Sequence, residues 1–292
     1  MQPLSDQSIR EWHASMWKPG FASVSADEAI FLRDMCRLAG ARVVLEIGTA
    51  SGLSSALLIK CLETVSGAQF RTIDCATTFW DGSGRQTGFL IDEHCAKTTV
   101  DARVMRGATA FDAAAVLSDR PADLIFIDAN HQHPWPLIDT LLTLPNLSPS
   151  GVMVHHDLDL YRKQDRVRGI GPKYLFDQLP DVLRLRSPAA PNIFALRMPP
   201  DTIALASRIA DAFLYPWSLA TPLETAMCAQ LERRLQQAYP RSDVAFKFST
   251  GLARHGHSAP SRETGWRDEL KRIPLVVPAV RLMRRTLARL RR

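Results

Sequence analysis

Short apolar runs alternate with stretches of helical periodicity between residues 41 and 200. Parallel strands need long connections and are buried on both faces, so this alternation predicts a parallel sheet with crossover helices. The expected strands are 43–46, 69–74, 101–106, 123–128, 151–155, 182–186 and 192–198. The helices expected between them are 54–63, 87–98, 110–117, 136–144 and 173–179.

A proline-rich turn at 187–191 joins the last two strands and predicts an antiparallel final pair. The fold class is therefore α/β: a Rossmann-like, doubly wound, seven-stranded and mostly parallel sheet with an antiparallel last strand and a helical C-terminal extension. Ser25 and Glu28 are spaced as a capping box at the start of a helix. The expected domains are a helical cap at 1–40, a ligand-binding domain at 41–200, a helical and polar extension at 201–268 and a basic amphipathic tail at 269–292.

Two glycines shape the turn between the first strand and its helix. Gly48 and Gly52 are four residues apart, and Glu46 stands two residues before the first of them. Glycine lets the backbone approach a ligand closely and adopt positive φ angles. A dinucleotide fingerprint needs a third glycine, so this spacing favours a nucleoside without phosphates; the alternative is that the glycines only tighten the turn. Asp74 ends the second strand, where a carboxylate can accept hydrogen bonds from both ribose hydroxyls.

The run from Val43 to Ser55 resembles the first motif of the class I S-adenosylmethionine-dependent methyltransferases. The resemblance implies S-adenosylmethionine as the cofactor, and the missing third glycine makes an NAD-dependent dehydrogenase the least favoured alternative. The residues that would hold the cofactor are Glu46, Gly48, Thr49, Gly52, Ser54, Asp74, Gly107, Ala108 and Asp128.

Ionisable residues follow the fourth and fifth strands, in the runs Asp128-Ala129-Asn130-His131 and His155-His156-Asp157. Because the carboxyl ends of parallel strands meet at one edge, both runs should converge on the crevice beside the glycines. The patterns Ile-Asp-x-x-His, Gly-Val-x-Val-x-His-Asp, Gly-x-Gly-x-Lys-Tyr-x-Phe and Asn-Ile-Phe-Ala-Leu-Arg resemble a small-molecule O-methyltransferase family over about residues 41–198. Relatives of that family, such as the macrocin O-methyltransferases, act on sugar hydroxyls of natural products and glycans. The patterns also resemble the cephalosporin-hydroxylase group.

This narrower resemblance implies roles for the strand-end residues. Asp128 and His131 would be catalytic, with His131 as the general base; the alternative is a hydrogen-bonded loop histidine. The metal ligands would be Asp128, His156 and Asp157. Relatives carry an oxygen ligand where His156 stands, and imidazole suits Mn²⁺ or Fe²⁺ better than Mg²⁺, which leaves the metal open. Strand alternation places His155 on the opposite face from His156, and His133 is expected at the surface or at the substrate rim.

The positive charge is concentrated at the end of the chain. The sequence has 36 Lys and Arg against 30 Asp and Glu, a net charge of +6. Residues 269–292 hold eight of the bases and one acid, which leaves 28 bases and 29 acids elsewhere. A nearly neutral body argues against a nucleic-acid-binding surface. The tail predicts an amphipathic helix that either lies on an anionic membrane or docks on the domain or a partner. Before it, 202–239 is expected to be helical and 241–267 polar and loose.

The five cysteines include no Cys-x-x-Cys pair, and no apolar run is long enough to span a bilayer. We therefore expect a cytoplasmic enzyme, or one peripheral at the inner face of the membrane, that methylates a hydroxyl of a small molecule or glycan. Two other hypotheses are the same fold with hydroxylase-like chemistry and a binding protein tethered to a membrane or complex. The sequence leaves open the acceptor, the metal and the oligomeric state, a homo-oligomer included.

Overall fold

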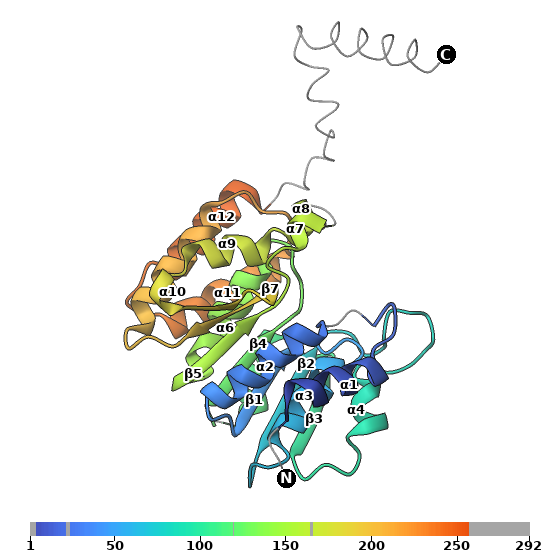
Figure 1. Ribbon diagram of the computed structural model, residues 1–292. Helices are drawn as coiled ribbons and strands as arrows, with labels where there is room; N and C mark the ends of the chain where they lie inside the picture. The colour runs from blue at the N-terminus through green and yellow to red at the C-terminus, as the bar shows by residue number, and fades with distance from the viewer. Residues whose placement is uncertain (1–3, 22–23, 119, 164–165, 257–292) are drawn as a thin grey trace, which may run out of the picture.

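A computed structural model of the protein describes residues 4–21, 24–118, 120–163 and 166–256. The tail predicted at 269–292 lies outside these residues. The centre of the molecule is a seven-stranded sheet of order β3-β2-β1-β4-β5-β7-β6 (Figure 1). The strands are β1 (Val43–Ile47), β2 (Gln69–Asp74), β3 (Asp101–Arg106), β4 (Ala122–Ile127), β5 (Leu147–His155), β6 (Arg184–Ser187) and β7 (Ala190–Arg197).

Strands β1 to β5 pair in parallel, whereas β7 runs antiparallel to both of its neighbours, β5 and β6. The predicted fold class and all seven predicted strands are confirmed. The largest difference is in β5, which begins at Leu147 rather than at Gly151. The sheet reverses its winding between β1 and β4, and this is the position at which open α/β sheets bind their ligands.

Alternate residues of each strand enter two hydrophobic cores, one on each face of the sheet. Val44, Phe126 and Val154 face one core, and Leu45 and Met153 face the other. The first core is covered by α1 (Asp6–Met16), α2 (Ala26–Leu38), α3 (Leu53–Leu62) and α4 (Phe89–His94) (Figure 1). The second is covered by η1 (Ala110–Asp112), α5 (Ala113–Leu117), α6 (Trp135–Thr143), η2 (Leu144–Asn146), α9 (Gly171–Gln178), α10 (Thr202–Ala210), η4 (Asp211–Leu214), α11 (Thr225–Ala238) and α12 (Val244–His255).

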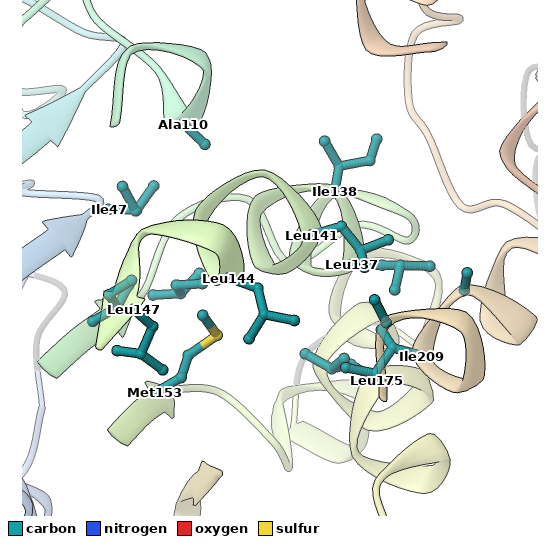
Figure 2. Close-up of a cluster of buried hydrophobic side chains, with 14 of the residues drawn as sticks. Ile47, Ala110, Leu137, Ile138, Leu141, Leu144, Leu147, Met153, Leu175 and Ile209 are labelled. Carbon is teal, nitrogen blue, oxygen red and sulfur yellow. The ribbon is translucent and has the colours of Figure 1, made fainter. Parts of the chain in front are cut away.

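The helices after residue 200 share the core of the sheet. Figure 2 shows Ile209 of α10 beside Leu137 and Leu141 of α6 and Leu175 of α9. Three shorter elements complete the chain: α7 (Leu160–Lys163), α8 (Arg166–Gly169) and η3 (Asp181–Leu183). None of the described helices is both long and apolar enough to cross a membrane.

Two expectations for this C-terminal region were wrong. The helix predicted over 202–239 is interrupted after η4, in a stretch that contains Pro216 and Pro222 and separates it from α11. The segment predicted to be loose contains the helix α12, which buries Val244 and Phe248. Its apolar positions are spaced four residues apart among polar ones, so the average composition concealed them.

The capping box predicted at the start of α2 is present. The Ser25 backbone N–H donates to Glu28 Oε2 at 2.6 Å, and the Glu28 N–H donates to Ser25 Oγ at 3.3 Å. This cap fixes the residue at which α2 begins. Within it, the hydrogen bond from the Ser25 N–H holds the Glu28 carboxylate in place.

The glycine loop, residues 48–52, touches the end of β4. Gly48 has a φ angle of +96°, and a Cβ atom there would lie 2.0 Å from the carbonyl oxygen of Asp128. The Asp128 N–H donates to the carbonyl of Ile47 at 2.8 Å. Gly52 has a φ angle of +88° and similarly packs on the backbone of Gly88, just before α4. A side chain at either glycine would push the loop away from its neighbours.

Glu46 links the strand before the glycine loop to the helix after it. Its carboxylate is fully buried and accepts hydrogen bonds from Ser54 at 2.7 Å, from Thr72 at 2.8 Å and from Ser55. These contacts join β1 to α3 and β2. Burial raises the pKa of Glu46 to about 7, although the three hydroxyl groups oppose this rise.

Gly48→Ala should destabilise the protein by at least about 2 kcal/mol, because it adds both a positive-φ penalty and a clash with Asp128. Gly82→Ala is the matched control, since Gly82 has a φ angle of +75° and a Cβ atom there would meet nothing within 4 Å. Urea unfolding midpoints compare the two variants. Equal losses of stability would show that the contact with Asp128 is unimportant.

Glu46→Gln should change how stability depends on pH. A carboxyl group whose pKa is raised on folding favours the folded state while protonated, so its contribution is lost as the pH rises toward 7. Between pH 5 and 8 the natural protein should lose about 2 kcal/mol relative to Glu46→Gln. The control is Glu224→Gln, at an exposed glutamate. Urea unfolding gives the free energy of unfolding at each pH. The prediction is contradicted if this free energy changes with pH in Glu46→Gln as much as it does in the natural protein.

Candidate active site

Four ionisable side chains meet where β4 and β5 end; we call Asp128, His131, His156 and Asp157 the acid–imidazole cluster. His131 Nε2 lies 2.9 Å from Asp157 Oδ2 and 3.3 Å from Asp128 Oδ1. The structure thus brings together the two runs that the sequence placed at this edge of the sheet. His131 is the more accessible imidazole, with 26% of its side chain exposed against 7% for His156.

His156 lies between acids on both sides of its ring. Nδ1 is 3.3 Å from Asp128 Oδ1 and 3.5 Å from Asp157 Oδ1, and Nε2 is 3.2 Å from Glu28 Oε2. These distances suit ion pairs, but the angles are not those of hydrogen bonds, so both buried ring nitrogens lack a hydrogen-bond partner among the described residues. A buried, unsatisfied nitrogen that faces two carboxylates is suited to binding a cation.

Asp157 is held in an unusual backbone conformation. Its φ angle is +60°, in the left-handed region that residues other than glycine rarely adopt. Asn192 of β7 supports it: the side-chain amide donates to Asp157 Oδ1 at 2.9 Å, and its oxygen accepts from the Asp159 N–H at 2.8 Å. The sequence placed Asn192 only at the start of a strand, and its contact with Asp157 spans 35 residues of chain.

The charges in the cluster shift one another. Burial lowers the pKa of His131, but Asp128 and Asp157 overcome this effect and raise it to about 9. The pKa of His156 also lies well above its usual value, because the same carboxylates and Glu28 outweigh burial. Burial raises the pKa of Asp128 and Asp157, yet the imidazoles keep both below their ordinary values. In this pairing both imidazoles hold protons at neutral pH.

The cluster fits a divalent cation. Asp128, His131 and Asp157 each offer one ligand atom, and these atoms lie within 4.8 Å of one another. His156 Nδ1 faces the same two carboxylates. Two carboxylates with imidazole nitrogens suit Mn²⁺, Fe²⁺ or Zn²⁺ better than Mg²⁺, which prefers an all-oxygen octahedron.

Asp74 braces the glycine loop from the end of β2. Its Oδ2 accepts from the backbone N–H groups of Thr49 at 2.9 Å and Ala50 at 3.0 Å, and its Oδ1 accepts from the N–H of Ala76 at 2.8 Å. The Ala108 N–H donates to the carbonyl of Asp74 at 3.1 Å. Residues predicted to bind the cofactor from three strand ends therefore lie around one loop.

Three of the predicted cofactor residues have buried side chains, one within that loop and two on the elements that flank it. Glu46 and Ser54 are bonded to each other, and Thr49 Oγ1 lies 2.6 Å from the hydroxyl of Thr72. Thr49 keeps 1% of its surface exposed, Glu46 none and Ser54 7%. These side chains position the loop backbone, whereas Gly48 and Gly52 let it lie close to its neighbours.

Two further histidines are outside the cluster. His155 lies on the opposite face, as predicted, and stacks on Phe194 with ring centroids 5.2 Å apart. His133 was expected at the surface or rim, and this was wrong: it is fully buried, with Nε2 2.9 Å from the carbonyl of Ala212. The segment around Ala212 and Ser218 covers it, a contact about 80 residues away that the local sequence does not reveal.

Glu28 is the residue of the site that sequence reasoning missed. The sequence assigned it to the capping box alone, yet it is 6% exposed and its carboxylate contacts His156. Burial raises the pKa of Glu28, and His156 more than reverses the shift. The spacing of Ser25 and Glu28 indicated only a capping box. Because capping boxes are common at exposed helix ends, this spacing does not indicate a role in the site.

Comparison with known proteins finds a family model that matches part of this chain. Residues 45–158 match the model of a family described as a methyltransferase domain. No curated protein matches the chain significantly. Similar solved structures include the O-methyltransferase TomG of Streptomyces achromogenes, involved in tomaymycin synthesis and bound to S-adenosylmethionine (21% identity, TM-score 0.45, covering 68% of this chain and 92% of that one). An O-methyltransferase of Bacillus cereus bound to S-adenosylhomocysteine is also similar (20% identity, TM-score 0.44, covering 66% and 90%).

The matched segment runs from β1 to the loop after β5, and it includes the glycine loop and all four members of the acid–imidazole cluster. The sheet order places both at the switch point between β1 and β4. Residues 45–158 of this chain are therefore a methyltransferase domain of the class I, S-adenosylmethionine-dependent type.

Proposed function

We propose that the protein transfers the methyl group of S-adenosylmethionine to a hydroxyl group of a small molecule or glycan, with the help of a divalent cation. One observation carries the proposal: Asp128 contacts the glycine loop through its backbone and belongs to the acid–imidazole cluster through its carboxylate. Its backbone packs under Gly48, while its carboxylate lies 3.3 Å from both imidazoles. The cofactor loop and the proton-handling side chains are thus joined at one residue.

The cofactor would lie across the ends of β1, β2 and β3. Asp74 would accept hydrogen bonds from the ribose hydroxyls with the lone pairs that the loop leaves free. Gly107 and Ala108 would flank the adenine ring of the cofactor, because they follow β3 at the same edge of the sheet. Glu46, Thr49 and Ser54 would act indirectly by holding the loop in place.

His131 would remove the proton of the acceptor. The sulfonium already activates the methyl group, so the protein has to align the hydroxyl and accept its proton. As the acceptor oxygen bonds to the methyl carbon, the carbon–sulfur bond breaks, S-adenosylhomocysteine leaves and the proton passes to the imidazole. His131 is favoured over His156 because it is more exposed and can meet an acceptor.

Asp128, Asp157 and His156 would hold the cation. A cation bound there would lower the pKa of the acceptor hydroxyl and neutralise the carboxylates that hold the proton on His131.

Free, unpaired cysteines agree with a cytoplasmic setting for this enzyme. A small hydroxylated acceptor is favoured because the residues outside 269–292 are nearly neutral, without the net positive charge typical of nucleic-acid-binding domains.

Turnover with methyl-labelled S-adenosylmethionine, on a panel of hydroxylated metabolites and glycans, tests the proposal. Label should enter an ether product, a chelator should abolish the transfer, and Mn²⁺ should restore it better than Mg²⁺. His131→Gln should lower kcat by about 10²- to 10⁴-fold and leave the affinity for S-adenosylhomocysteine nearly unchanged, because His131 acts on the acceptor.

His94→Gln is the control for that substitution, since His94 is about half exposed on α4. Absence of S-adenosylhomocysteine binding at high micromolar concentration, measured by calorimetry, contradicts the proposal. So does full activity of His131→Gln. A requirement for a redox cosubstrate would support hydroxylase-like chemistry in its place.

A further inference from the structure

Glu28 is a buried carboxylate with two partners from different parts of the chain. It lies in the first turn of α2, on the helical cap, and keeps 6% of its surface exposed. The same oxygen, Oε2, accepts from the Ser25 N–H at 2.6 Å and lies 3.2 Å from His156 Nε2. A capping box needs only the first of these contacts, and it forms readily at exposed helix ends. The cap therefore does not explain why this carboxylate is buried against an imidazole.

His156 connects Glu28 to the acid–imidazole cluster. One ring nitrogen faces Glu28, and the other lies 3.3 Å from Asp128 and 3.5 Å from Asp157. Neither nitrogen has a hydrogen-bond partner of good geometry among the described residues. A histidine that binds a metal through one nitrogen commonly gives its other N–H to a carboxylate, which fixes the tautomer and the direction of the ring.

We propose that Glu28 is a positioning residue: it holds the His156 ring so that Nδ1 faces a divalent cation between Asp128 and Asp157. The inference rests on the proposed function, in that it takes the cluster to hold a cation. The N-terminal cap then contributes to the active site as well as covering the sheet.

Three variants separate this role from helix capping. Glu28→Gln keeps an oxygen acceptor for the Ser25 N–H but removes the charge that faces His156. Ser25→Ala removes the hydroxyl that caps the Glu28 N–H and leaves the Glu28 carboxylate in place. His156→Gln removes the imidazole itself. It is the reference variant, because it should cause the largest loss of Mn²⁺ affinity.

The experiment measures Mn²⁺ affinity of the full chain by the EPR signal of free Mn²⁺, with S-adenosylhomocysteine calorimetry and thermal melting of each variant alongside. Glu28→Gln should weaken Mn²⁺ binding by about 10- to 100-fold, as loss of an outer carboxylate commonly does, with S-adenosylhomocysteine affinity unchanged. Ser25→Ala should lower the melting temperature and leave Mn²⁺ affinity unchanged.

Two results overturn the inference: Mn²⁺ affinity of Glu28→Gln equal to that of the natural protein, or no Mn²⁺ binding by the natural protein at all. Retained binding of S-adenosylhomocysteine would leave methyl transfer standing in both cases. The first result removes only the role of Glu28, and the second also removes the help of a cation. Loss of S-adenosylhomocysteine binding by the natural protein would instead remove the proposed function.

Discussion

The contact between Gly48 and the backbone of Asp128 is the constraint on which the rest of the site depends. With no Cβ atom and a φ angle of +96°, Gly48 lets the loop after β1 lie directly against the end of β4. Asp74 holds that loop through two backbone N–H groups, and Glu46 joins β1, before the loop, to α3, after it, and to β2 through buried hydroxyls. The loop therefore enters the site with little freedom left, which favours a preorganised surface for a ligand.

The acid–imidazole cluster is the second constraint. Three carboxylates, that of buried Glu28 and those of partly buried Asp128 and Asp157, would repel one another if they were alone, and isolated buried charge is very costly. His131 and His156 compensate by holding protons between them. A divalent cation would supply the same positive charge at one point. Cation binding and protonation of the imidazoles are therefore alternative ways to neutralise the carboxylates.

Periodicity and turn chemistry were sufficient to predict much of this fold. The seven strands, the parallel order and the capping box at Ser25 followed from local patterns, because alternation and helix-cap preferences act over a few residues. The convergence of Asp128 and Asp157 followed from the rule that parallel strands share their carboxyl edge. The contacts of Glu28 with His156 and of Asn192 with Asp157 did not follow, because they depend on packing between elements far apart in the chain.

The same limit explains two of the three errors made outside the site. His133 is buried by the segment around Ala212, and α12 is stabilised by tertiary packing of Val244 and Phe248 rather than by a strong local pattern. Helices α10 to α12 share one core with the sheet, so their side chains complete the face opposite the N-terminal cap.

The central claim is that one edge of the sheet binds a methyl-donating nucleoside beside a carboxylate–imidazole cation site. Anomalous diffraction from crystals grown with Mn²⁺ and S-adenosylhomocysteine tests it most directly. We expect one strong anomalous peak between Asp128, Asp157 and His156 Nδ1, with the ribose of the nucleoside at Asp74. A nucleoside bound away from Asp74, or Mn²⁺ bound away from the cluster, would contradict it.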